Sequence, residues 1–307
     1  MSLRSLHSHN SLHSLHSLII FLSIILLTSC YGGDGSDPHV NAVYYWTTIF
    51  QRSQPKHDFM ERTGVKRLYM RFFDVVMSEE GRPVPNATIE FLDTIPQDME
   101  VIPVVYILNE CMEQPADSLA PKIAKRIRQM CQTHDVPNVH EIQIDCDWTR
   151  RTQSQYFKFL SQLRQKLKAD SLGLSATIRL HQLSMDPPPA DRGILMVYNT
   201  GDVTDRNCPN PILDIDDVRP FMKNLKDYPL PLSAAYPIFS WDVIFRGDRF
   251  IGIQHFEGEY PLMPGDTIIT YRPTKAEVIE VEKLIDHFRS DCNEEVILFD
   301  LSDKNLE

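Results

Sequence analysis

The sequence is poor in basic residues, with 31 Lys and Arg against 42 Asp and Glu among 307 residues and a formal net charge of −11. Nucleic-acid binding depends mainly on Lys and Arg side chains that neutralise phosphates, so this deficit argues against a nucleic-acid partner. The sequence also lacks a P-loop, and no GxGxxG motif follows its first predicted strand. These absences argue against a nucleotide, and we expect the protein to use no cofactor.

Cysteine is scarce, and no two cysteines have the CxxC spacing of a zinc site or a redox pair. Beyond Cys30 the chain has five cysteines, an odd number that leaves at least one thiol free: Cys111, Cys131, Cys146, Cys208 and Cys292. The sequence does not fix any pairing among them, but it excludes a dense disulfide framework. We therefore expect no metal site, and we expect Cys146 to be a small buried side chain.

The apolar run near the N-terminus, Leu18–Leu27, is shorter than the roughly 20 residues that a membrane-spanning helix needs. The sequence Leu27-Thr28-Ser29-Cys30 fits a lipobox, in which small residues precede a cysteine that becomes the lipidated N-terminus. We therefore predict a lipoprotein signal peptide over 1–29 and a flexible tether over 30–40. This predicts a lipid-anchored protein of the cell envelope, on the periplasmic or surface side of the outer membrane, which contacts the membrane through its anchor only.

Beyond the tether, β-rich runs alternate with helical patterns in a single predicted domain over 41–307. The predicted strands are 41–50, 67–77, 101–108, 141–148, 174–183, 194–200, 230–238 and 295–301, and the predicted helices are 55–63, 117–132, 150–168, 216–226 and 274–290. Eight strands with helices between most of them predict an α/β protein with a (β/α)₈ barrel, and an open doubly wound sheet is the alternative.

Two connections of this predicted barrel are poorly helical. Residues 78–100 are proline-rich, and Met185–Arg192 contains three consecutive prolines, so we expect irregular structure around strands 2–3 and 5–6. After the seventh strand, residues 241–271 have the pattern of a hairpin whose turn is Arg246–Arg249.

The segment Glu141–Thr149 carries the clearest chemical signal. Polar and apolar residues alternate from 141 to 148, which predicts a strand with Asp145 and Asp147 on one face near its carboxyl end and Trp148 just beyond. Two carboxylates one strand step apart repel each other, so at least one needs a proton, a cation or hydrogen-bond donors nearby. Such a pair is suited to a functional site.

Functional side chains of parallel barrels lie at the carboxyl ends of the strands. The catalytic candidates at these ends are Asp145, Asp147, Glu110 and Asp74. The candidates for substrate binding are Tyr45, Trp46, Arg71, Arg179, His181, Tyr198, Asn199, Tyr236, Trp241, Asp242 and Asp300. Aromatic rings stack on the C–H faces of sugars and carboxylates bind hydroxyls, so this set favours a saccharide. The two arginines are suited either to structural ion pairs or to an anionic group, and His181 either to a base or to a polar core position.

The segment 142–149 resembles the fourth-strand signature of family 18 glycoside hydrolases, the chitinase-like family, which reads Asp-x-x-Asp-x-Asp-x-Glu. Met196-Val197-Tyr198-Asn199 is similar to the Met-x-Tyr-Asp of the same family. The resemblance implies a barrel in which the Tyr and Asp hold the substrate's N-acetyl group as nucleophile and the Glu protonates the leaving oxygen. Here Ile142, Thr149 and Asn199 replace the first Asp, the Glu and the last Asp. A threonine hydroxyl cannot supply the proton near neutral pH, so the resemblance implies the fold and the site rather than the activity.

The chain also resembles a group of Bacteroidota cell-envelope lipoproteins, and this implies a location but brings no activity. The segments that carry this resemblance are 71–75, 102–105, 141–149, 174–182 and 237–241. Three hypotheses remain open. The protein binds a glycan with weak or no hydrolysis, or it is an active glycoside hydrolase with a relocated acid (Glu110, Asp74 or Asp242), or it is a structural lipoprotein that binds an envelope protein partner.

Overall fold

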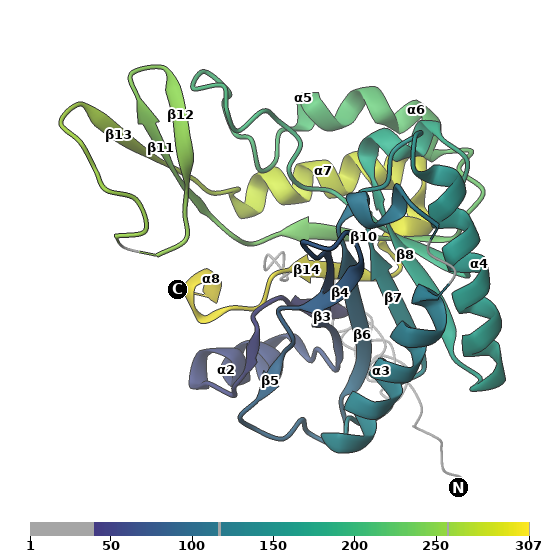
Figure 1. The fold of residues 1–307 in the computed structure, drawn as a ribbon. Coiled ribbons are helices and arrows are strands. Elements are labelled where there is room, and N and C mark those ends of the chain that lie inside the picture. The colour runs from purple at the N-terminus through teal and green to yellow at the C-terminus, as the bar shows by residue number, and fades with distance from the viewer. Residues whose placement is uncertain (1–39, 116–117, 257, 307) are drawn as a thin grey trace, which may run out of the picture. The chain divides into compact units, whose positions relative to one another are not determined.

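The computed structural model describes residues 40–115, 118–256 and 258–306, and within them eight parallel strands close into a barrel (Figure 1). The strands are β1 (Ala42–Tyr45), β3 (Arg67–Met77), β6 (Glu100–Ile107), β7 (Glu141–Asp145), β8 (Gly173–Arg179), β9 (Arg192–Met196), β10 (Leu232–Pro237) and β14 (Val296–Phe299). Each strand pairs with its neighbours along the chain, and β1 pairs with both β3 and β14. This closure confirms the predicted (β/α)₈ barrel and excludes the open sheet. The predicted signal peptide and Cys30 lie outside the described residues.

Four longer helices pack on the outside of the barrel: α2 (Gln54–Thr63), α3 (Leu119–Thr133), α4 (Gln153–Ala169) and α7 (Lys275–Phe288). Figure 1 shows α3 and α4 side by side over the strands that precede them. The helices form where apolar residues recur at helical spacing, as in α4, where Tyr156, Leu160, Leu163 and Leu167 are all buried. The helix α2 is capped at Ser53, whose hydroxyl accepts the Lys56 N–H, and it ends at a left-handed Gly64.

The barrel is irregular at the two predicted places. Between β3 and β6 the described chain forms no helix, and instead β4 (Pro83–Asn86) pairs antiparallel with β3 while β5 (Glu90–Phe91) pairs with β2 (Ile49–Phe50). After β8 the chain makes only a 3₁₀ turn, η2 (Leu180–Ser184).

The helix predicted over 216–226 is also broken. It consists of α5 (Ile215–Val218), a 3₁₀ segment at Arg219–Phe221 and α6 (Met222–Leu225). Pro220, inside the 3₁₀ segment, has no N–H with which to continue the helical ladder.

The predicted hairpin after β10 contains a third strand. The strands β11 (Trp241–Arg246), β12 (Arg249–Gln254) and β13 (Asp266–Tyr271) form an antiparallel sheet in the order β12-β11-β13, at the upper left of Figure 1. The β11–β12 turn has Gly247 at φ 61°, a left-handed conformation that glycine adopts without strain. The chain then continues through α7 and β14 to the short helix α8 (Asp303–Leu306). In the part of the chain that the structure describes, no helix is both long and apolar enough to cross a membrane.

The amino end of the barrel is closed by a network of charged side chains. Arg192 pairs with Glu141 at 2.9 Å and also with Glu295, and Arg67 pairs with Glu100 at 2.9 Å and with Glu295. Burial raises the pKa of Glu295, but the charges and hydrogen bonds of Arg192 and Arg67 outweigh it and hold that pKa below its usual value. One layer above this network, the Tyr44 hydroxyl donates to Gln143 at 2.7 Å. These side chains therefore fill the amino end of the barrel interior, and only the carboxyl end is left for a site.

Candidate functional site

Asp145 lies at the centre of the carboxyl end of the barrel. It is the last residue of β7 and only 3% exposed, and its Oδ1 accepts hydrogen bonds from Thr177 Oγ1 at 2.7 Å and Arg179 Nη2 at 3.0 Å. Both donors come from the neighbouring strand β8. Burial lowers the pKa of Arg179, but the nearby groups, Asp145 foremost among them, together outweigh burial and hold that pKa above its usual value, so the guanidinium stays charged. The buried carboxylate therefore has a fixed cation beside it.

Asp147 occupies a different environment. The strand ends at Asp145, three residues earlier than the alternation predicts, and the Asp147 side chain is 58% exposed in the following loop. The last paired residues of β7 and β8 are Ile144 and Ala176, so the backbone that follows Ile144 is no longer hydrogen-bonded to β8 as a strand. Oδ1 of Asp147 lies 3.9 Å from Nε2 of His181 in η2. The chain thus separates the two carboxylates into one buried and one solvated group.

Trp148 is buried outside the barrel rather than placed at the site. Its ring lies 5.9 Å from that of Tyr156 and 5.2 Å from that of Phe157. Thr149 follows at the surface, and its N–H donates to Thr152 Oγ1 at 3.0 Å just before α4 begins. Thr149 therefore helps to shape the start of this helix.

A second ion pair lies within β3. Arg71 Nε donates to Asp74 Oδ1 at 2.7 Å and its Nη2 to Oδ2, so both oxygens of Asp74 accept from the same guanidinium. The guanidinium also lies over the Trp46 ring, 5.2 Å from its centroid. A register shift in β3 next to Arg71 accompanies this geometry. Of the two interpretations of Arg71 and Arg179, the structure favours ion pairs.

An aromatic wall joins the ends of several strands around these ion pairs. Its members are Trp46, Tyr106, Tyr198, Phe239, Trp241 and Phe299. Phe299 lies at its centre, with its ring 4.8 Å from Tyr198 and 5.3 Å from Trp46. Trp46 lies 6.3 Å from Tyr106 on one side, and Phe239 lies 5.5 Å from Trp241 on the other.

The sequence-based prediction missed three members of this wall: Tyr106, Phe239 and Phe299. Their only signal in the sequence is that each lies within two residues of the end of a predicted strand. Tyr106 is coupled to the centre of the site, because the charge of Asp145 adds to the effect of burial in raising the Tyr106 pKa. Burial likewise raises the pKa of Tyr198 while the nearby Arg179 lowers it, and the Tyr198 hydroxyl lies 3.1 Å from Met196 Sδ.

Asp300 is the one candidate carboxyl group near this wall whose pKa burial clearly raises, to about 6. It follows β14 and accepts a hydrogen bond from the Asn305 side chain, and its charge contributes to raising the pKa of Tyr198. Asp242 on β11 instead accepts from Thr270 at 2.6 Å and lies 3.7 Å from Lys304 Nζ.

Two further predicted residues lie at the surface. Glu110 is exposed in the 3₁₀ helix η1 (Asn109–Met112). Asn199 is exposed at φ 55°, a left-handed conformation that asparagine tolerates better than most residues.

The structure does not bring Tyr45 and Tyr236 to this site. Alternation along β1 turns Tyr44 and Trp46 inward and Tyr45 outward, where its hydroxyl donates to the Ile49 carbonyl at 2.8 Å. Tyr236 is likewise buried between the barrel and its outer layer, with its hydroxyl 2.8 Å from Asn293 Oδ1. Both residues lie near the ends of their strands, but their side chains point to the outer face of the barrel.

All five cysteines after Cys30 are free thiols, and three of them are buried. His57, Asp58 and Glu61 hold possible ligand atoms within 4.8 Å of one another, but they are exposed on α2, on the outside of the barrel. Exposed acidic side chains in such groups are common on protein surfaces without a metal ion.

No protein-family model and no curated protein sequence matches the chain. Its fold is similar to that of a chitinase from Chromobacterium violaceum, with a TM-score of 0.55 and 11% identity over 87% of this chain and 96% of that one. The spore cortex-lytic enzyme SleL of Bacillus megaterium gives a TM-score of 0.56 and 12% identity over 89% and 73% of the two chains. The GH18 chitinase ChiB of Flavobacterium johnsoniae gives 0.52 and 12% over 86% and 88%. The chain therefore has the closed barrel fold of family 18 chitinases and chitinase-like proteins.

Proposed function

We propose that the protein binds a saccharide at the carboxyl end of its barrel and hydrolyses it weakly or not at all. The observation that carries this proposal is the aromatic wall around the buried Asp145 carboxylate. Aromatic faces bind the C–H surface of a sugar ring, and the polar rim of Asp147 and His181 is exposed to its hydroxyls. The similarity in fold to chitinases agrees with a saccharide ligand.

Weak hydrolysis follows from the groups around Asp145. Thr149 stands where the family 18 signature has its proton donor, and losing a general acid typically costs about 10²–10⁴ in rate. Its backbone contacts serve the start of α4 rather than a reaction. Asp145 already accepts bonds from Thr177 and Arg179, and Asp74 is held by Arg71. Binding through stacking survives these changes, because it needs no proton transfer.

The charge balance favours a neutral saccharide over an acidic one. Arg71 and Arg179 are each paired with an aspartate, and the additional carboxylate of Asp147 faces solvent at the rim. An acidic sugar would meet no uncompensated cation from either arginine and would be repelled by Asp147.

A second candidate function is hydrolysis with a relocated acid, and Asp300 is the observation that favours it. A carboxyl group whose pKa is raised to about 6 keeps its proton closer to neutral pH than an ordinary aspartate does. Asp300 belongs to the predicted binding residues, and it is better suited to this role than Asp74 or Asp242, whose carboxylates are paired with cations.

We also propose that a lipid on Cys30 anchors the protein in the cell envelope of a bacterium related to the Bacteroidota. The lipobox at 27–30 supports this proposal. A structural role with an envelope protein partner is the outcome that remains if no saccharide binds.

Calorimetric titration with a neutral N-acetylglucosamine oligomer, together with an assay for released sugar, tests the proposed function. We expect binding by the wild type, a loss of about tenfold or more in Trp46→Ala, and no change in the control Phe256→Ala, an exposed aromatic residue between β12 and β13. Turnover that disappears in Asp147→Asn or Asp300→Asn would overturn the binding-only proposal in favour of a hydrolase. Turnover gained by Thr149→Glu would support the binding-only proposal, and a lack of saccharide binding in every variant would contradict it.

A further inference from the structure

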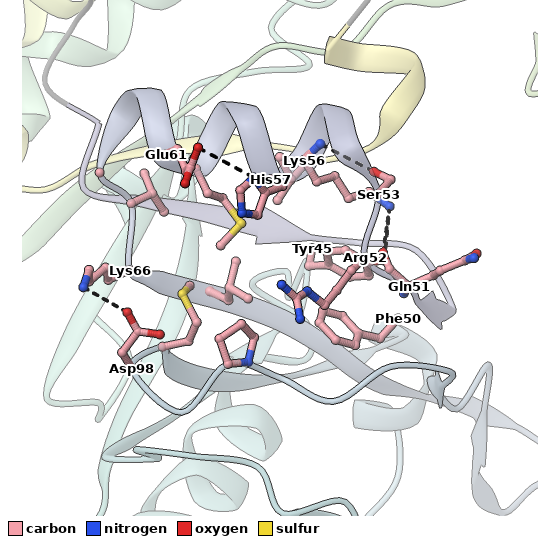
Figure 2. A pocket seen from close by; sticks show the side chains of 17 residues that line it. Tyr45, Phe50, Gln51, Arg52, Ser53, Lys56, His57, Glu61, Lys66 and Asp98 are labelled. Carbon is pink, nitrogen blue, oxygen red and sulfur yellow. Dashed lines mark hydrogen bonds and ion pairs between the residues drawn. The ribbon is translucent and has the colours of Figure 1, made fainter.

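A groove of about 360 Å³ lies on the outer surface of the barrel, and no residue of the aromatic wall lines it (Figure 2). One side is α2, and the other is the irregular segment before β6 that contains Pro96, Asp98 and Met99. The groove exists because the barrel has no helix between β3 and β6 in the described chain, so the outer faces of β1 and β3 are covered on one side only. Its volume lies within the range of small-molecule sites, which is about 300–1,000 Å³.

The floor of the groove is apolar and narrow. Tyr45, Val65, Leu68 and Met99 line it, yet each is at most 3% exposed. Met60 on α2 adds an apolar wall. An α-helix with its side chains is about 10–12 Å wide and does not fit into so narrow a floor. A single alkyl chain is slender enough to reach these side chains.

Most charged groups along the groove are already paired. Lys66 lies 2.9 Å from Asp98, and His57 lies 3.8 Å from Glu61. Lys66, the Lys or Arg side chain at this end of the groove, is therefore already paired with a carboxylate. These two pairs offer no strong attraction for an ionic ligand.

At the other end lie Lys56 and Arg52. Lys56 Nζ is buried and lies 3.2 Å from the Gln51 carbonyl oxygen and 3.5 Å from Asp303. Among the described residues the guanidinium of Arg52 has neither a hydrogen bond nor an ion pair, and Figure 2 shows it directed into the groove. Its backbone N–H donates to Asp93 at 2.8 Å, but Asp93 does not line the groove. Arg52 is therefore an available cation at one end of an apolar channel.

We propose that this groove binds a long-chain carboxylate, with the carboxylate on Arg52 and the alkyl chain along Met60, Val65 and Met99. A guanidinium presents parallel N–H donors that match the two oxygens of a carboxylate. The apolar floor supplies the hydrophobic contribution, which grows with the length of alkyl chain that is buried. This site is separate from the proposed saccharide site and does not depend on it.

Displacement of a fluorescent fatty-acid probe from the protein by dodecanoate tests the proposal. We expect displacement by dodecanoate, no displacement by acetate, which lacks the chain, and at least tenfold weaker displacement by the neutral dodecyl maltoside. Arg52→Gln should weaken dodecanoate binding about tenfold or more, because it removes a charge-assisted contact. The matched control is Arg62→Gln, an exposed arginine of α2 that does not line the groove, and it should bind like the wild type.

Met60→Trp provides an independent variant, because the larger ring should fill the groove and abolish binding. Thermal unfolding followed by circular dichroism checks that each variant is folded, and Arg52 is exposed, so its substitution should not disturb the core. Equal displacement by dodecanoate and dodecyl maltoside would refute the proposal, as would unchanged binding in Arg52→Gln. A failure of dodecanoate to displace the probe, or to bind in direct calorimetry, would also refute it.

Discussion

Asp300 should make the stability of the protein depend on pH in the direction opposite to that of an ordinary carboxylate. Burial raises its pKa from the usual 3.8 to about 6. Between these values the folded protein holds a proton that the unfolded chain has lost. The stability due to protonated Asp300 is therefore fully present below about pH 4, and it is lost as the pH rises through 6. At about 1.4 kcal/mol per pH unit, the loss between pH 4 and pH 7 is on the order of 3 kcal/mol.

Urea unfolding of the wild type and Asp300→Asn at several pH values from 4 to 7.5 measures this effect. The asparagine keeps an oxygen that can accept the Asn305 hydrogen bond but cannot ionise. We expect its unfolding free energy, relative to the wild type, to rise by about 2–3 kcal/mol over that range. The control Asp248→Asn removes a fully exposed carboxylate in the β11–β12 turn and should parallel the wild type. Parallel curves for the wild type and Asp300→Asn would show that Asp300 is not protonated in the folded state at pH 5.

Three other perturbations give direct tests. Gly193→Ala should lower the unfolding free energy in urea by about 1–3 kcal/mol, because the new Cβ would lie 2.8 Å from the side chains of Ile178 and Leu232. In the control Gly173→Ala the new Cβ meets nothing closer than 3.7 Å, so the unfolding free energy should hardly change. Equal effects of the two substitutions would contradict the packing argument. Cys30→Ser should shift the protein from the membrane to the soluble fraction or block its processing, and unchanged fractionation counts against the lipid anchor. A neutral N-acetylglucosamine oligomer should bind at least tenfold more tightly than a uronic acid oligomer of the same length, and a preference for the acidic one would mean that an arginine is available to ligand.

The sequence was sufficient for the barrel because the strands and helices repeat a local pattern. The strand predicted over 67–77 coincides with β3, and the buried positions of α4 are those of its apolar spacing. The two helix-poor connections were also visible, since proline removes backbone donors wherever it stands. Closure of the sheet followed from the number of strands rather than from any single residue.

The site was harder to predict, because it depends on where a strand ends and which face a side chain shares. Asp147 continues the alternation in the sequence, yet the ladder to β8 stops at Ile144 and leaves it in solvent. The prediction that Tyr45 lies at the site was wrong for a related reason. Its neighbour Trp46 faces the barrel interior, and two consecutive residues of a strand cannot face the same side. The pairing of Arg179 with Asp145 joins residues 34 positions apart along the chain. Such contacts are set by the closed barrel and have no local signal.

The ion pairs at the carboxyl end determine how a ligand can bind there. Arg71 and Arg179 hold Asp74 and Asp145, so these four charges stabilise β3 and the ends of β7 and β8 and are not free for a substrate. Breaking either pair to bind a ligand would leave a buried charge uncompensated, at a cost of about 3–5 kcal/mol. Affinity must therefore come mainly from the exposed parts of aromatic side chains that are only partly buried, which at this end belong to Trp46, Trp241 and Phe299. A site of this kind selects for the shape of a neutral ring and has little means of stabilising the charge that develops during glycosidic bond cleavage, and for this reason we favour binding over catalysis.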